Sequence, residues 1–211
     1  MRTTVNLRPY RLAVAVTVAG AALLAGCASN KGAPNTIYDF GAPSAQVSTP
    51  VQPAALPPIV VMDATGGAVL DNERMVYRLN YADPLQARTY AGSRWSGTPL
   101  ALVTQRLKVR LAQAGVTVLS ATDAANRVPI LRIEVDDFVH AFSSTSASEG
   151  QILLRASVLA DHRLVAQKSF AHNAPAPSQD AAGGVAALAA GTDRIALDLK
   201  NWLSTLDLQG K

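Results

Sequence analysis

The residue with the most distinctive chemistry in this chain of 211 residues is its only cysteine, Cys27. It ends the tetrapeptide Leu-Ala-Gly-Cys and follows an uncharged run from Leu12 to Leu24. Three arginines precede the run, and the first acidic residue is Asp39. A basic start, a short apolar centre and small residues before a cleavage point are typical of a secretory signal, and the run is shorter than the ~20 residues of a membrane-spanning helix. Residues 1–26 are therefore predicted to be a signal peptide.

The tetrapeptide also resembles the bacterial lipobox. This resemblance implies cleavage before Cys27, a diacylglycerol on its sulfur and a further acyl chain on its new amino group, so that a covalent lipid, and no cofactor, is expected. One acyl chain binds a membrane only weakly, whereas several hold firmly. Ala28 resembles the pattern of lipoproteins on the periplasmic face of the outer membrane, because an aspartate at that place usually causes inner-membrane retention. The alternative is an ordinary signal peptide with an incidental cysteine.

Other reactive side chains lack the spacing that chemistry requires. His140, His162 and His172 have no metal-ligand spacing and no cysteine partners. Asp136 and Asp137 are paired in sequence, but adjacent residues of a regular strand point to opposite faces. The sequence contains no nucleophile elbow, phosphate-binding loop or zinc-protease motif. We therefore expect no catalytic residue, no metal site and no enzyme activity; a histidine metal site and a functional aspartate pair are the minor alternatives.

The charge balance argues against a nucleic-acid partner. The chain has 19 Lys and Arg against 15 Asp and Glu, but three of the basic residues lie in the predicted signal peptide. The remainder is close to neutral, whereas nucleic-acid binding requires a basic patch or stripe.

Residues 27–57 are predicted to be the acylated cysteine and a tether rich in proline and alanine. Such a stretch has too little apolar surface to offset the entropy of ordering, and a coil of this length spans ~30 Å. The segment Ile37-Tyr38-Asp39-Phe40-Gly41 interrupts it with two aromatic residues. We expect Tyr38 and Phe40 to dock either on the chain's own domain or on a partner; the alternative is an incidental turn.

Residues 58–208 are predicted to form one domain. Apolar runs and alternation predict six strands and two helices. The strands are expected at residues 59–62, 75–81, 116–119, 128–142, 151–161 and 164–172. The helices are expected at residues 98–114 and 184–206, with a polar loop at residues 81–97.

The strand at residues 128–142 changes phase along its length, because Leu131, Ile133 and Val135 have one parity and Phe138 has the other. A bulge near Asp136 and Asp137 would return the apolar side chains to the core. Short connections then predict a three-stranded antiparallel meander over residues 128–172.

The first helix has the clearest boundaries. Thr98 is expected to cap it, Pro99 suits its first position, and Gly115 suits its end. Its apolar stripe comprises Leu100, Val103, Leu107, Leu111 and Ala114. The basic side chains on its other face, Arg106, Lys108 and Arg110, are expected to lie mainly in solvent rather than to form a binding patch.

Together the elements predict an α+β fold in the order β-β-α-β-β-β-β-α. The sheet is expected to be mixed and largely antiparallel, with both amphipathic helices packed on one face.

An ordered set of motifs in the domain resembles the ABC-type transport auxiliary lipoprotein family. The set comprises Met75-Val76-Tyr77-Arg78, Tyr90 with Arg94-Trp95 and Pro99, Leu131-x-Ile133-x-Val135-x-x-Phe138, and Leu199-x-x-Trp202-Leu203. The resemblance implies a non-enzymatic adaptor of an envelope transport system, with an MCE-domain protein and ABC transporter subunits as partners and lipid as cargo. A lipoprotein that activates or braces a cell-wall synthase is the alternative, and a homo-oligomer is left open.

The expected partner contacts are Tyr90, Arg94 and Trp95, with Tyr38 and Phe40 as further candidates. Arginine beside tryptophan is typical of interface hot spots. The alternative for Trp95 is a place in the core beneath the helix.

Overall fold

The computed structural model describes residues 35–42, 56–123 and 128–208. Residues 35–211 group into one compact unit. The predicted signal peptide, Cys27 and most of the predicted tether lie outside the described residues. Among the helices in the described ranges, none is long and apolar enough to cross a membrane.

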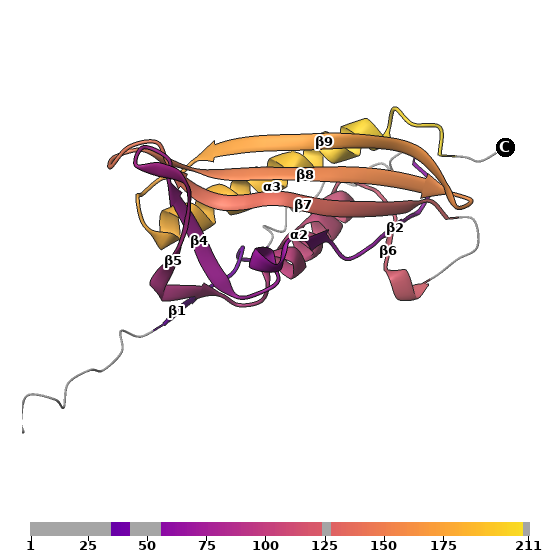
Figure 1. Ribbon diagram of the computed structural model, residues 1–211. Helices are drawn as coiled ribbons and strands as arrows, with labels where there is room; N and C mark the ends of the chain where they lie inside the picture. The colour runs from indigo at the N-terminus through magenta and orange to yellow at the C-terminus, as the bar shows by residue number, and fades with distance from the viewer. Residues whose placement is uncertain (1–34, 43–55, 124–127, 209–211) are drawn as a thin grey trace, which may run out of the picture. The chain divides into compact units, whose positions relative to one another are not determined.

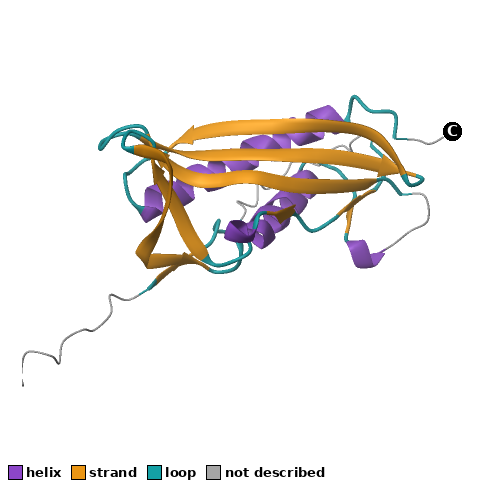
Figure 2. Ribbon diagram, in the orientation of Figure 1, coloured by secondary structure: helices purple, strands orange, loops and turns teal. Residues whose placement is uncertain are grey.

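The domain is a curled mixed sheet with two long helices (Figure 1). The strands are β1 (Thr36–Tyr38), β2 (Ile59–Val61), β3 (Thr65–Gly66), β4 (Arg74–Leu79), β5 (Asp83–Trp95), β6 (Val118–Leu119), β7 (Ile130–Phe142), β8 (Ser148–Ala160) and β9 (Arg163–Pro175). The helices are α2 (Pro99–Gln113) and α3 (Ala181–Leu203), with short 3-10 turns η2 (Ala68–Leu70) and η3 (Ala121–Asp123). Figure 2 shows both long helices on the same side of the sheet, so the predicted fold class is confirmed.

Strand β7 is the centre of the sheet. It pairs along its whole length with β8, which pairs in turn with β9, and all three run antiparallel. On its other edge, β7 pairs in parallel with β2, β3 and β4, each along a different part of its length. The predicted meander and the predicted bulge are both confirmed, because the β7–β8 register shifts between Val135 and Asp137.

The buried side chains of the meander and of both helices form one core. Leu131, Ile133 and Val135 are at most 2% exposed, as are Leu107 and Leu111 of α2. Thr98 caps α2 by accepting from the Ala101 N–H, and Gly115 follows its end with a φ of 85°. Helix α3 lies so close to β8 that a Cβ at Gly150 would come within 2.8 Å of the Leu188 nitrogen. The α2 stripe and its boundaries therefore agree with the prediction.

One predicted loop is wrong. Residues 83–95 form β5, which pairs with β4 and, at its end, with β1. Most of this strand is exposed and shows no apolar alternation, so its sequence resembles a loop. The element order predicted from sequence also lacked β1 and β3, which have three and two residues.

Candidate functional site

The segment at residues 35–42 docks on the domain rather than extending away from it. Strand β1 pairs in parallel with the end of β5, with Thr36 opposite Ser93 and Tyr38 opposite Trp95. The Tyr38 carbonyl accepts a hydrogen bond of 2.7 Å from the Ser96 N–H. The structure thus adds these residues to the predicted domain, and it shows that the aromatic segment docks on the chain's own domain.

Three aromatic rings fix this segment to the core. Phe40 is 8% exposed and meets Trp95 edge to face, with ring centroids 5.7 Å apart. Both rings also contact Phe138 of β7, at 6.0 and 5.9 Å. Trp95 is 2% exposed, so its ring is not available to a partner in the folded domain, and the core alternative for this residue agrees with the structure.

Arg106 holds the same segment from the helix side. Its guanidinium donates to the carbonyl oxygens of Phe40 and Gly41 at 3.2 and 3.3 Å, and to both carboxylate oxygens of Asp193 in α3. Arg110 donates to the same carboxylate at 2.6 Å. The expectation that these two arginines lie in solvent is wrong, because Arg106 is only 8% exposed and Arg110 is half-buried.

The carboxylate of Asp193 is therefore shared by two cations. Burial alone would raise its pKa, but the hydrogen bonds from Arg110 and Arg106 hold the pKa below its usual range. We call this cluster of Arg106, Arg110 and Asp193, together with Phe40 and Trp95, the N-terminal clasp. It joins α2, α3 and the first strand of the domain.

The other candidate contact residues lie in β1 and β5. Arg94 is partly exposed and forms an ion pair with Glu73. Tyr38 is half-buried at the end of β1. Tyr90 is half-buried too, and its hydroxyl lies 2.8 Å from His140 Nδ1. Arg94 and Tyr38 thus have side-chain surface left for a partner, whereas Trp95 and Phe40 support them from beneath.

His140 is fully enclosed, between Tyr90, Phe142 and the first turn of α3. It is 1% exposed, and its Nε2 atom has no hydrogen-bond partner among the described residues. A Cβ at Gly184 would come within 2.5 Å of its ring, so the absence of a side chain there makes room for the histidine. Burial lowers the pKa of His140, which favours the neutral ring, and burial raises the pKa of Tyr90 above its usual value.

This burial predicts a loss of stability in mild acid. Below a pH of about 6.5 the unfolded chain binds a proton at His140 that the folded chain does not, so the free energy of unfolding falls as the pH falls, by at most ~1.4 kcal/mol per unit from this group. Denaturant titrations between pH 7.5 and 5 measure the slope. The variant His140→Leu should have a flatter slope in this range, and an unchanged slope would contradict the assignment.

The paired aspartates have separate structural roles. Asp137 forms an ion pair of 2.7 Å with Arg78 of β4, and Asp136 lies 3.4 Å from Arg155 of β8. His162 lies in the two-residue turn between β8 and β9, where it and Asp161 have positive φ values. Within residues 35–42, 56–123 and 128–208, no three histidine, cysteine or acidic side chains are grouped so that they could hold a metal ion.

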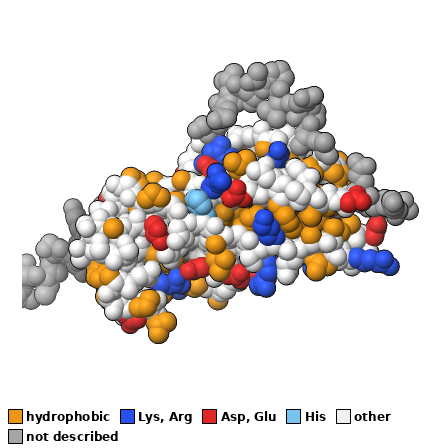
Figure 3. All heavy atoms as spheres, turned by 90° about the horizontal axis from the view of Figure 1, so that it is seen from above, with side chains coloured by type: hydrophobic (Ala, Val, Ile, Leu, Met, Phe, Trp, Pro, Cys, Tyr) orange, Lys and Arg blue, Asp and Glu red, His pale blue; other side chains and the backbone are white. Residues whose placement is uncertain are grey.

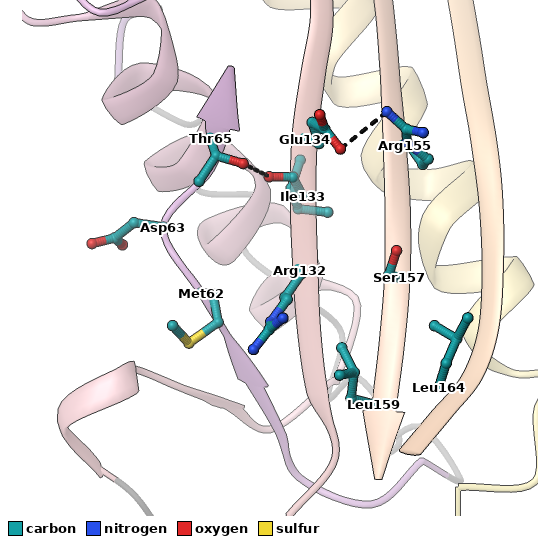
Figure 4. A pocket seen from close by; sticks show the side chains of 10 residues that line it. All are labelled: Met62, Asp63, Thr65, Arg132, Ile133, Glu134, Arg155, Ser157, Leu159 and Leu164. Carbon is teal, nitrogen blue, oxygen red and sulfur yellow. Dashed lines mark hydrogen bonds and ion pairs between the residues drawn. The ribbon is translucent and has the colours of Figure 1, made fainter. Parts of the chain in front are cut away.

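A groove of about 510 Å³ lies on the face of the sheet that the helices leave open (Figure 4). Its rim is the segment Met62–Thr65, and its floor is formed by side chains of β7 and β8 with Leu164 of β9. Glu134 in the floor pairs with Arg155 at 3.0 Å. The close-up shows Arg132 beside Met62. The groove is open and mixed in charge, and it contains no nucleophile–base pair.

Two features of the domain escaped the sequence analysis. The Arg106–Asp193 contact joins residues 87 positions apart, and the Tyr90–His140 contact joins residues 50 apart. The sequence did contain one signal for the Arg106–Asp193 contact, because Arg106 and Arg110 are four residues apart and so share a helix face. No local signal identified Asp193 as their partner.

The model of one family, described as the ABC-type transport auxiliary lipoprotein component, matches residues 38–199. No curated protein matches the sequence.

Two solved structures share the fold. A crystal structure of a Xanthomonas campestris protein has 22% identity and a TM-score of 0.66, and the match covers 81% of this chain and 95% of that one. A second, described as an uncharacterized protein, has 12% identity and a TM-score of 0.61, with coverage of 80% and 98%. At these identities the likeness concerns the fold.

Proposed function

Because the chain belongs to the ABC-type transport auxiliary lipoprotein family, we propose that it is a non-enzymatic adaptor of an envelope lipid transport system, anchored to the outer membrane through Cys27. Its partners in this proposal are an MCE-domain protein and ABC transporter subunits. The observation that carries the proposal is the family match, which spans the domain from β1 to α3.

The contacts of the polar side chains support a binding role. Asp136, Asp137 and Asp193 are each held by arginines, and His140 is enclosed with Tyr90. These side chains therefore stabilise the fold. The face of the domain in Figure 3 carries interspersed acidic and basic side chains with apolar groups between them, a composition suited to protein contacts.

The docking of β1 sets how far the domain lies from its anchor. Thr36 is nine positions after Cys27, with eight residues between them, and nine residue steps reach at most ~30 Å when fully extended. A tether that ran to residue 57 would reach about three times as far. In this proposal the domain therefore stays near the bilayer, and the transporter component must extend to it.

The proposed partner surface is the corner formed by β1 and the end of β5. Arg94 and Tyr38 expose side chains there, and an arginine beside an aromatic residue suits an interface centre. Trp95 and Phe40 keep this corner rigid from beneath.

The proposal is tested by photo-crosslinking in cells. A crosslinking residue replaces Arg94, and the matched control replaces Arg163, an exposed arginine beside the β8–β9 turn. We expect the crosslinker at position 94 to capture MCE or ABC subunits several-fold more often than the one at position 163, and Cys27→Ser to abolish the capture. Capture of a peptidoglycan synthase at position 94 would instead support the cell-wall alternative, and capture of neither class would contradict both.

A further inference from the structure

Three of the eight large apolar side chains that are exposed in the described residues lie at one end of the domain. Leu85, near the start of β5, is 94% exposed, and Tyr81, in the connection between β4 and β5, is 47% exposed. Because Leu79 of β4 pairs with Phe142 at the end of β7, this connection lies beside the one from β7 to β8. Strand β1, which carries the 54% exposed Ile37, lies at the same end, opposite the β8–β9 turn (Figure 1).

The polar groups at this end suit the boundary between water and lipid. The β7–β8 connection contains Ser143, Ser144 and Ser146, which are uncharged. Asp83 is an acid close to Leu85, and its carboxylate accepts a hydrogen bond of 2.9 Å from the Leu85 N–H. From Pro84 to Trp95 strand β5 carries two arginines and no acid. Tyrosine and arginine side chains place apolar atoms against lipid and keep their polar ends in water.

The chain length upstream of β1 places this end near the bilayer. Eight residues link Cys27 to Thr36, so the nine residue steps have a reach of at most ~30 Å. Thr36 is paired with Ser93, which lies eight residues along β5 from Leu85, a separation of at most ~27 Å. The span from Cys27 to Thr36 is therefore about as long as the distance along β5 from Ser93 to Leu85. Ile37 and Leu85 can thus meet the same bilayer surface that holds the lipid on Cys27.

We infer that this end of the domain, with Leu85, Tyr81 and Ile37, is a second membrane contact that binds the lipid surface beside the acyl anchor. The inference rests on the acylation of Cys27 in the proposed function. Lipid chains alone would leave the domain free to rotate about its linkage. A second contact made by side chains fixes which face lies on the bilayer and leaves the β8–β9 end directed away from it.

The test uses the acylated full-length protein in vesicles of phosphatidylethanolamine and phosphatidylglycerol. Because Cys27 is the only cysteine and its sulfur is acylated, one introduced thiol can be labelled selectively. A polarity-sensitive fluorophore is attached to Leu85→Cys, to Ile37→Cys or to the control Leu164→Cys. Leu164 is also an exposed leucine, at 60%, but it lies beside the β8–β9 turn. None of these substitutions removes a core side chain.

Quencher groups on the phospholipid chains report the depth of each label. We expect the labels at positions 85 and 37 to be quenched several-fold more strongly than the label at position 164, with blue-shifted emission. Equal quenching at all three positions, in protein that floats with the vesicles, would overturn this inference and leave the proposed adaptor role intact. Protein that does not float would lack the anchor, and both proposals would then fail.

Discussion

Replacing Trp95 with alanine is expected to destabilise the domain by about 3–5 kcal/mol, the range for removal of a buried large aromatic side chain. Its ring is 2% exposed and contacts both Phe40 and Phe138. The substitution would leave a cavity where β1, β5 and β7 meet. Urea unfolding followed by circular dichroism measures the loss.

Tyr81→Ala is the matched control for Trp95. Tyr81 is also an aromatic residue next to β5, but it is 47% exposed, so its loss should change stability by less than about 0.5 kcal/mol. An unchanged midpoint for Trp95→Ala together with lost partner capture would contradict the core assignment and would favour a direct contact by Trp95.

Replacing Asp193 with alanine is expected to cost about 2–4 kcal/mol. The side chain of Arg106 is only 9% exposed, and the substitution leaves its charge without a counterion inside the protein. Breaking a fully buried ion pair costs ~3–5 kcal/mol, and we expect somewhat less here because the Asp193 side chain is 27% exposed. Thermal and urea unfolding of the same variant measure the change.

Asp198→Ala is the control on the same helix. Asp198 pairs with Arg194 four residues away, at 3.4 Å, and both side chains are largely exposed. Such pairs contribute ~0.5 kcal/mol or less. Equal losses for the two aspartates would show that the clasp contributes no more than a surface pair.

The pH dependence of the Asp193 contribution has a defined direction. The folded-state pKa is lowered, so the stabilisation is present above the unfolded value near 3.8 and is lost as the pH falls through the folded value. This range lies below the one expected for His140, so the two groups can be separated in one titration.

The elements predicted correctly from sequence are those whose signals are local. The α2 boundaries follow from Thr98, Pro99 and Gly115, and the β7 bulge follows from the change of parity before Phe138. Strand β5 had no such signal. It contains Pro84 and Gly92 and is exposed over most of its length, so its extended state depends on pairing with β4 and β1.

The clasp was only half predictable. The aromatic segment at residues 37–41 is anomalous for a tether, and this composition predicted docking on the domain or on a partner; the structure shows the segment on the domain. The burial of Arg106 could not be inferred from the α2 pattern, because a charged residue opposite an apolar stripe normally faces water. A neighbouring helix supplies the carboxylate in this case, and the partner lies 87 residues away.

The clasp lies between the proposed lipid anchor at Cys27 and the rest of the fold, and this position has a mechanical consequence. Any pull on an acylated Cys27 would load β1 and the Phe40 ring first, before the long strands of the meander. If the whole segment of residues 35–42 detached, the next described residue would be Leu56, which is 29 positions after Cys27. The greatest distance that the chain could span between Cys27 and the fold would then rise from ~30 Å to ~100 Å. The contacts that hold this segment, including those of Arg106 and Trp95, would thus set the force at which the linkage between Cys27 and the domain lengthens.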